Sequence, residues 1–361
     1  FMRALRRTAE EVKEDFWLMG EVIHGDYSRW VNGETLHSVT NYALHKALYS
    51  GHNDHNYFEI AHTVKYLLNM GDLDLYNFVD NHDVERIYTK LSNKAHFAPV
   101  HVLLYTLPGV PSIYYGSEFG IEGKKEKYSD DSLRPALDLE DYADASKKNP
   151  CTALIAALGK VRQHTPALSY GSYAELMLTN RQYAFARDLE GVRVIVTVNN
   201  DDNEAGMSLQ AGNCAEYVGT LTGQRVSVEG GRINVTVAAN SGEIWVPAEG
   251  MPEYVPVKTE NITDNPVIKD SAIEEAPAIQ QAEIAIEETA AAKSVHADED
   301  PSEKAPVVDL NKTPEDMTVE ELQLAILDRM AKNGPVTDQM KKTVYDNVWH
   351  DSLVNWLKSF Q

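Results

Sequence analysis

The sequence predicts an α/β domain, an all-β domain and a small helical segment, in that order. Helical stretches alternate with short β-like runs up to about Arg162, which is typical of a parallel sheet covered by helices. From about Leu168 to Val246, short alternating strands are separated by turn-forming clusters, which is typical of a β-sandwich. An acidic stretch with almost no aromatic residues follows. We therefore predict four segments, bounded at 1–167, 168–248, 249–312 and 313–361.

The first segment is predicted to hold four strands and four helices. The strands are apolar runs at 17–22, 36–44, 75–79 and 111–115. The helices have apolar residues at helical spacing, at 1–16, 57–70, 95–107 and 153–162. In the second helix, Ile60, Val64, Leu67 and Leu68 are expected on one inward face. Four parallel strands are half of an eight-stranded (β/α)8, or TIM, barrel, so the predicted fold class is α/β with a partial barrel.

The remaining segments differ from the first in composition. The all-β segment has predicted strands at 183–187, 192–198, 232–237 and 243–246. The third holds about fifteen acidic residues against about four basic ones, which is typical of a disordered, self-repelling linker. In the fourth, Thr313 followed by Pro314 predicts the start of a helix. Its apolar stripe would be Val319, Leu322, Ile326 and Met330.

Charge and composition restrict the classes of partner. The chain has 361 residues and a formal net charge of −22. Such acidity argues against nucleic acid or an anionic membrane as a partner. Two cysteines, Cys151 and Cys214, follow no disulfide or metal pattern and are predicted to be unpaired. The chain opens inside an amphipathic helix, so we expect further sequence before Phe1 in a parent protein; cellular location and oligomeric state stay open.

Two short runs contain residue types that bind metals. The run His52-Asn53-Asp54-His55 lacks further ligands, and we interpret it as a solvated loop. Asp130 and Asp131 are candidates for holding calcium, but loop acids are common. No metal ligand is therefore assigned, and calcium is the one cofactor left open.

Glu21 and Asp83 form the sharpest chemical pattern, because each lies at the C-terminal end of a predicted strand. In a parallel barrel these strand ends meet on the face that carries the active site. Hydrolysis of a glycosidic bond needs carboxyl groups on both sides of that bond, one to protonate the leaving oxygen and one to attack or stabilise the sugar cation. The pair therefore indicates a glycoside hydrolase.

The flanking motifs resemble those of the α-amylase family of glycoside hydrolases. Three motifs occur in the family's order: Met19-Gly20-Glu21-Val22, then Phe78 to Asp83, then Gly109 to Glu118 with its Tyr-Tyr-Gly. Arg134-Pro135 after an acidic loop also fits. The resemblance covers roughly Phe1 to Val246 and includes the β-sandwich. It implies the C-terminal half of the family's barrel, similar to neopullulanases, cyclomaltodextrinases and maltogenic amylases, with starch- or maltodextrin-type α-glucans as substrate.

The resemblance also implies roles for individual residues. Glu21 would be the general acid that later acts as the base, and Asp83 would stabilise the oxocarbenium-like transition state. His82 and Asn81 would bind the same sugar. Trp30, in the loop after Glu21, would stack on the leaving side of the substrate. His24 is a weaker candidate for substrate contact.

The family's nucleophile is an aspartate in a Gly-x-Arg-x-Asp motif, and this motif is absent from the sequence. We expect it in the sequence before Phe1, and we expect the present chain alone to be nearly inactive. Three functions stay open: a retaining hydrolase of α-1,4 glucosidic bonds, with α-1,6 bonds as a further option, an α-glucan transglycosylase, and a non-catalytic relative used for binding or assembly.

Overall fold

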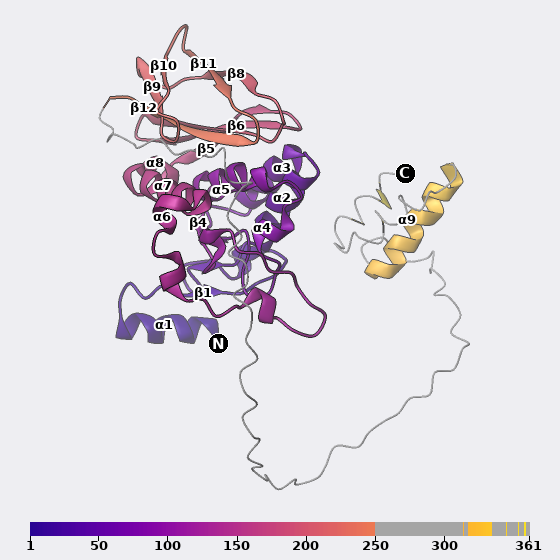
Figure 1. Cartoon of the computed structure of the whole chain (residues 1–361). Coiled ribbons are helices and arrows are strands. Elements are labelled where there is room, and N and C mark those ends of the chain that lie inside the picture. Colours follow the sequence, from indigo (N-terminus) through magenta and orange to yellow (C-terminus); the bar gives the residue numbers. More distant parts are fainter. Residues whose placement is uncertain (250–312, 314–316, 334–343, 345–352, 354–356, 359–361) are drawn as a thin grey trace, which may run out of the picture. The chain divides into compact units, whose positions relative to one another are not determined.

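The structure is a computed structural model that describes residues 1–249, 313, 317–333, 344, 353 and 357–358. The chain divides into two compact units, Phe1–Glu274 and Glu275–Gln361. The first unit contains a helical part built on short parallel strands and an all-β part (Figure 1). The predicted acidic linker at 249–312 lies outside the described residues, apart from Glu249. The proposed segment boundaries stay predictions.

Four short strands form the parallel framework. They are β1 (Met19–Gly20), β2 (Ser38–Val39), β3 (Tyr76–Asn77) and β4 (Val110–Pro111). β1 pairs with β2 and β3 pairs with β4, both in parallel, and a parallel bridge from Thr40 to Tyr76 joins the two pairs. The four predicted strands therefore exist in the predicted order, but each has only two residues in this framework.

Buried amide side chains hold this framework together. Asn41 Nδ2 donates to Asn77 Oδ1 at 2.8 Å, and Asn77 Nδ2 donates to the Pro108 carbonyl at 2.8 Å. Gly109, with φ +112°, lies against Asn77, where an added Cβ would come within 2.7 Å of Nδ2. The approach of β4 to β3 thus depends on a residue without a side chain.

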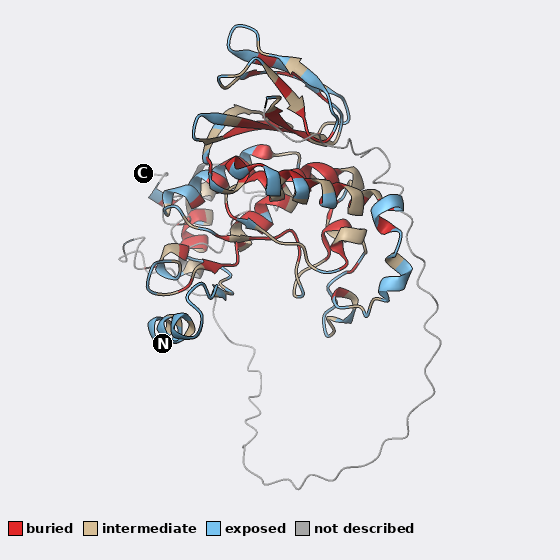
Figure 2. Ribbon diagram, turned by 90° about the vertical axis from the view of Figure 1, so that its left-hand side faces the viewer, coloured by how far each residue is buried: buried red, intermediate tan, exposed pale blue. Residues whose placement is uncertain are grey.

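The helices of this part are α1 (Met2–Val12), α2 (Tyr42–Asn53), α3 (Tyr57–Asn69), α4 (Ile87–Lys90), α5 (Phe97–Thr106), α6 (Ala145–Lys148), α7 (Pro150–His164) and α8 (Pro166–Tyr170). Short 3-10 turns are η1 (Tyr27–Arg29), η2 (Lys94–His96), η3 (Ser117–Phe119), η4 (Asp131–Leu133) and η5 (Leu139–Tyr142). Helices at the predicted places 57–70, 95–107 and 153–162 are confirmed as α3, α5 and α7. In α3, Leu68 is exposed rather than inward. No residue of α1 is buried, and Figure 2 shows α1 largely pale blue.

The predicted strand at 36–44 is wrong beyond Thr40, because α2 begins there. Asn41 is the N-cap of α2, and its side chain accepts a hydrogen bond from the Leu44 backbone N–H at 3.1 Å. A side-chain cap of this kind satisfies one of the free N–H groups of a helix start. The interpretation of His52–His55 as a solvated loop is also wrong, since His52 lies in the last turn of α2 and is fully buried.

The all-β part consists of two antiparallel layers. Its strands are β5 (Ser172–Leu178), β6 (Gln182–Leu189), β7 (Val192–Asn199), β8 (Ala205–Gln210), β9 (Glu216–Gly219), β10 (Arg225–Ser227), β11 (Arg232–Val237) and β12 (Ser241–Pro247). Six form one sheet in the order β10-β9-β12-β7-β6-β5, and β11 pairs with β8. The four predicted strands are confirmed as β6, β7, β11 and β12, while β5, β8, β9 and β10 were not predicted.

The six-stranded sheet is covered on both faces. Residues such as Phe185 and Val196 on one face share a core with the helices of the α/β part. Residues such as Ile195 and Trp245 on the other face pack with Val235 of the small sheet. Burial on both faces explains why β7 reads as a nearly continuous apolar run.

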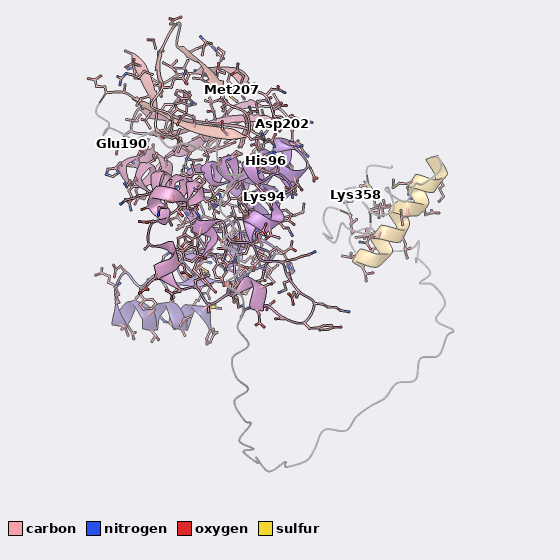
Figure 3. All side chains as sticks on the ribbon, in the orientation of Figure 1. Lys94, His96, Glu190, Asp202, Met207 and Lys358 are labelled. Carbon is pink, nitrogen blue, oxygen red and sulfur yellow. The ribbon has the colours of Figure 1, made fainter. Side chains whose placement is uncertain are left out.

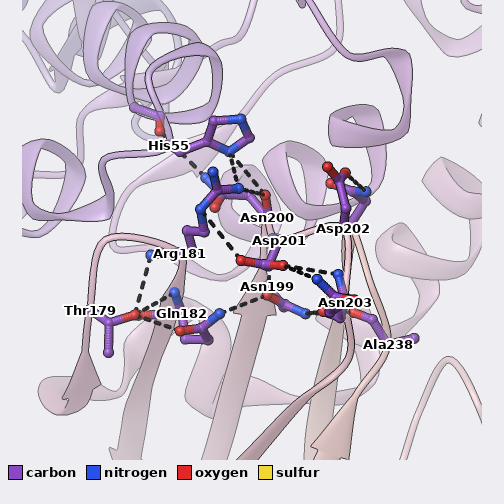
Figure 4. Close-up of polar contacts among 12 residues, drawn as sticks. His55, Thr179, Arg181, Gln182, Asn199, Asn200, Asp201, Asp202, Asn203 and Ala238 are labelled. Atoms are coloured by element: carbon purple, nitrogen blue, oxygen red, sulfur yellow. Dashed lines mark hydrogen bonds and ion pairs between the residues drawn. The ribbon is translucent and has the colours of Figure 1, made fainter.

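Polar side chains mark the boundary between the two parts of this unit. Nδ1 of His55, which follows α2 with φ 49°, lies 3.0 Å from the Asn200 carbonyl and 3.0 Å from Arg181 Nη1 (Figure 4). Arg181 also pairs with Asp201 at 3.4 Å. His96 and Asp202 lie on either side of the same boundary (Figure 3). The two parts therefore meet through specific contacts as well as apolar packing.

The second unit contains α9 (Val319–Asn333). Leu322 and Ile326 are buried and Val319 and Met330 pack against their cluster, which confirms the predicted stripe. The helix begins at Val319 rather than directly after Thr313, so the predicted start is wrong. Among the residues described, no helix is long and apolar enough to span a membrane.

Candidate active site

Glu21 directly follows β1, with its carboxylate at the carboxyl end of the parallel strands. The adjacent Val22 backbone N–H donates to Thr40 Oγ1 at 2.8 Å, which ties this strand end to the end of β2. The Glu21 side chain is exposed, and its Oε1 accepts a hydrogen bond from the Tyr42 hydroxyl at 2.9 Å. Because Tyr42 is the first residue of α2, the helix that follows β2 orients the acid that follows β1.

A second hydrogen bond to Tyr42 comes from the segment after β3. Asn81 Nδ2 donates to the Tyr42 hydroxyl oxygen at 2.9 Å, and Asn81 Oδ1 accepts from the backbone N–H groups of Asp83 and Val84 at 2.9 and 3.1 Å. Three consecutive hydrogen bonds therefore connect Glu21 to the backbone of Asp83. The structure thus brings together the predicted site residues Glu21, Asn81 and Asp83. The residue that connects them, Tyr42, was not predicted to be part of the site.

The Asp83 carboxylate is held by Arg134. Arg134 Nη2 donates to Asp83 Oδ1 at 2.8 Å, and Arg134 Nε donates to the His82 carbonyl at 3.1 Å. His82 Nε2 lies 3.4 Å from Asp83 Oδ2. These contacts orient a carboxylate that can stabilise positive charge on a sugar.

Buried polar side chains hold the segment from Asn81 to Asp83 in place. Asp80 is 2% exposed and accepts hydrogen bonds from the Ile87 backbone N–H and the Ser117 hydroxyl, both at 2.7 Å. Burial raises the pKa of Asp80 to about 6. Arg86, fully buried, donates to Ser117 Oγ at 3.1 Å and to the Leu133 carbonyl at 2.8 Å. These contacts fix the turn that presents Asn81 to Asp83.

Two predicted substrate contacts lie in the loop after Glu21. His24 is exposed, and Trp30 follows η1 with 41% of its surface exposed. The Trp30 carbonyl accepts the Leu36 backbone N–H at 2.9 Å, which closes the loop. The exposed indole suits a stacking platform, and contact of either side chain with a sugar stays a prediction.

The fit of a calcium ion to the acidic loop is poor. Asp130 Oδ1 is 2.9 Å from Lys125 Nζ, and Asp130 Oδ2 is 3.4 Å from Arg134 Nη2. The hydrogen bond from Lys125 lowers the pKa of Asp130. Within the described part of the chain, no group of three or more His, Cys, Asp or Glu side chains is arranged to hold a metal ion. The contacts of Asp130 therefore do not support the calcium prediction.

Tyr42 is the site residue that the sequence did not indicate. The available signal was Asn41, because an asparagine before a helical stretch is a common N-cap. Burial, opposed by the hydrogen bond from Asn81 and assisted by the one to Glu21, raises the pKa of Tyr42 to about 12. The phenol therefore stays protonated near neutral pH and can donate to the Glu21 carboxylate throughout.

Known proteins resemble this chain over the same region. A cyclomaltodextrinase of Thermoanaerobacter pseudethanolicus is 29% identical over 211 residues, which cover 56% of this chain and 35% of that protein. Neopullulanase 2 of Thermoactinomyces vulgaris is 26% identical over 255 residues, which cover 68% and 42%. The matched stretch thus spans less than half of either relative.

The fold is also found in solved structures. The chain matches a cyclomaltodextrin glucanotransferase with a three-domain ABC distribution with a TM-score of 0.61 and 21% identity, over 70% of this chain and 53% of that one. At this identity the match shows the fold alone. Residues 1–166 match the model of the family described as alpha amylase, catalytic domain. This matched part of the chain, which carries Glu21, Asn81 and Asp83, is therefore similar to the catalytic domain of the α-amylase family.

Proposed function

We propose that residues 1–166 supply the acid and the transition-state carboxylate of a retaining α-glucan hydrolase. The observation that carries this proposal is the chain of hydrogen bonds from Glu21 through Tyr42 and Asn81 to Asp83. It connects two carboxylate residues from different strand ends, which is the arrangement that glycosidic bond cleavage requires. The names of the relatives, cyclomaltodextrinase and neopullulanase, support an α-glucan substrate.

In the proposed reaction, each residue has a separate task. The Glu21 carboxyl protonates the leaving glycosidic oxygen, and its carboxylate then takes a proton from the incoming water. Asp83 and His82 hold hydroxyls of the sugar that becomes positively charged. Asn81 has one amide hydrogen beyond its bond to Tyr42, so it can also bind a hydroxyl. Trp30 would stack on the sugar on the leaving side.

We also propose that β1–β4 are the second half of the family's eight-stranded barrel. A retaining reaction in this family needs a nucleophilic aspartate, and no Gly-x-Arg-x-Asp motif is present in the 361 residues. The chain by itself is therefore expected to hydrolyse maltooligosaccharides very slowly. Loss of a nucleophile typically lowers kcat by several orders of magnitude.

An external nucleophile provides a direct test with the chain as it exists. Azide can attack C1 of α-maltosyl fluoride from the face opposite to fluoride, so that the C–N bond forms, the C–F bond breaks and fluoride leaves with the electron pair. We expect azide to accelerate fluoride release and to yield β-maltosyl azide. Asp83→Asn should remove this acceleration, because the sugar cation loses its carboxylate. Sugar binding without any azide-dependent turnover would instead favour the non-catalytic alternative.

The bond type and the acceptor define the remaining alternatives. Incubation of the chain with β-maltosyl fluoride and maltotriose distinguishes hydrolysis from transfer, because the β-fluoride takes the place of the glycosyl–enzyme intermediate. Attack by water, assisted by Glu21 as base, expels fluoride and gives maltose, whereas attack by a sugar hydroxyl expels fluoride and gives products longer than maltotriose. Comparison of maltotriose with panose, which contains one α-1,6 bond, distinguishes α-1,4 from α-1,6 cleavage. We propose α-1,4 hydrolysis as the main activity, since both named hydrolases are consistent with it.

A further inference from the structure

Tyr42 occupies a position from which it controls the orientation of the Glu21 carboxyl. Its ring is fixed edge-on against the buried Phe78, with ring centroids 4.9 Å apart at 80°. It also contacts His45 edge-on, at 6.1 Å and 84°. A phenol that is held by two rings and is the first residue of a helix has little freedom to move its hydroxyl.

The direction of each hydrogen bond around the phenol is determined. Asn81 Oδ1 accepts two backbone N–H groups, from Asp83 and Val84, so its amide nitrogen must face Tyr42. That nitrogen donates to the phenol oxygen, and the phenol hydrogen is left for Glu21 Oε1. Because Oε1 receives a hydrogen bond, the acid proton of Glu21 belongs on Oε2.

We propose that Tyr42 is a positioning residue that aims the proton of Glu21 at the leaving oxygen and stabilises Glu21 after it has released that proton. This inference rests on the proposed function. When Oε2 transfers its proton, the C–O bond breaks, and its electron pair stays with the leaving oxygen. Glu21 becomes a carboxylate, while Tyr42 keeps its own proton. The hydrogen bond to Oε1 is then charge-assisted and stronger, so it contributes more to the transition state than to the ground state.

This role is tested with substrates that differ in how much their leaving group needs protonation. The chain is assayed with azide on α-maltosyl fluoride, which loses fluoride without protonation, and on maltotriose, which needs it. Tyr42→Phe is expected to lower kcat on maltotriose by about tenfold or more, with KM little changed, and to leave the fluoride within about twofold. Combining Tyr42→Phe with Glu21→Gln should add no further loss on 4-nitrophenyl α-maltoside, which Glu21→Gln still cleaves, because the phenol acts through Glu21.

Tyr49→Phe is the matched control, because it removes a hydroxyl from another tyrosine of the same helix. It should leave both rates unchanged. Asn81→Asp keeps an acceptor for the Asp83 and Val84 backbone N–H groups but replaces the amide donor beside the phenol with a carboxylate oxygen, which draws the phenol hydrogen away from Glu21. It provides a second route to the loss on maltotriose, should Tyr42→Phe fold poorly. Equal losses on both substrates, or no loss on either, would overturn the proposal. Absence of azide-dependent turnover in the unmodified chain would instead refute the proposed function, on which this inference rests.

Discussion

His101 should make the protein less stable in mild acid. It lies in α5, fully buried, where burial lowers its pKa from 6.5 to about 4. Its Nδ1 lies 2.7 Å from the Phe97 carbonyl and must carry the hydrogen, while Nε2 is buried without a hydrogen-bond partner. A second proton would therefore have no acceptor. The neutral ring is the form that the folded protein accommodates.

The sign and size of the effect follow from proton binding. Because the folded-state pKa is lowered, the unfolded state binds more protons between pH 6.5 and about 4, and stability falls as pH falls through this range. At pH 5.5 one such histidine lowers the free energy of unfolding by about 1.4 kcal/mol, and above pH 7.5 this loss is absent. His45 and His52, whose pKa values burial lowers to about 4 and about 3, add to the total.

Urea unfolding at pH 7.5 and pH 5.5, followed by circular dichroism, measures this loss in the unmodified chain and in His101→Asn. The asparagine amide can keep the hydrogen bond to Phe97 but cannot titrate. We expect the unmodified chain to lose about 1.4 kcal/mol more than the variant between the two pH values. His164→Asn is the matched control, because exposed His164 makes the same bond to the carbonyl four residues earlier, at 2.7 Å. Equal pH dependence in the chain and in His101→Asn would refute the reasoning.

Three further predictions concern other contacts. Burial raises the pKa of Asp80 to about 6, so its ionisation lowers the stability of the folded state as pH rises above about 4. The free energy of unfolding of Asp80→Asn, measured in urea, should exceed that of the unmodified chain by about 2–3 kcal/mol at pH 7.5 and by little at pH 4. Arg134→Met should lower azide-dependent turnover of α-maltosyl fluoride about tenfold or more with the melting temperature little changed, because Asp83 loses its 2.8 Å partner. Arg187→Met should cost about 1–3 kcal/mol in unfolding free energy, because the buried guanidinium donates to the Gly171 carbonyl at 2.8 Å and its loss would leave that carbonyl unpaired.

The general architecture could be predicted from the sequence because it depends on local patterns. The spacing of Ile60, Val64 and Leu67 predicts α3, and all three are buried. Glu21 and Asp83 could be assigned to strand ends because Glu21 closes one apolar run and Asp83 lies in the short polar segment directly after another. The strands of the parallel framework were predicted as too long, since apolar residues around a buried sheet extend beyond the paired backbone.

The remaining features depend on contacts between distant segments. The apolar run at 36–44 placed Tyr42 in a predicted strand. Nothing in the neighbouring sequence reveals that Glu21 and Asn81 would both reach its hydroxyl. His52 lies in a polar run that reads as a loop, yet its ring is buried against Tyr57 and His96. Burial of a polar run by such neighbours leaves no periodic signal in the sequence.

The central claim is that Glu21 donates the proton to the leaving group of an α-glucan. The most direct measurement is azide-dependent cleavage by the unmodified chain and by Glu21→Gln of three α-maltosides with leaving groups of decreasing acidity: fluoride, 4-nitrophenolate and glucose. Glu21→Gln is expected to leave the fluoride rate nearly unchanged, to lower the aryl rate partially and to abolish cleavage of maltotriose. Equal rates for the chain and the variant on all three substrates would contradict the central claim.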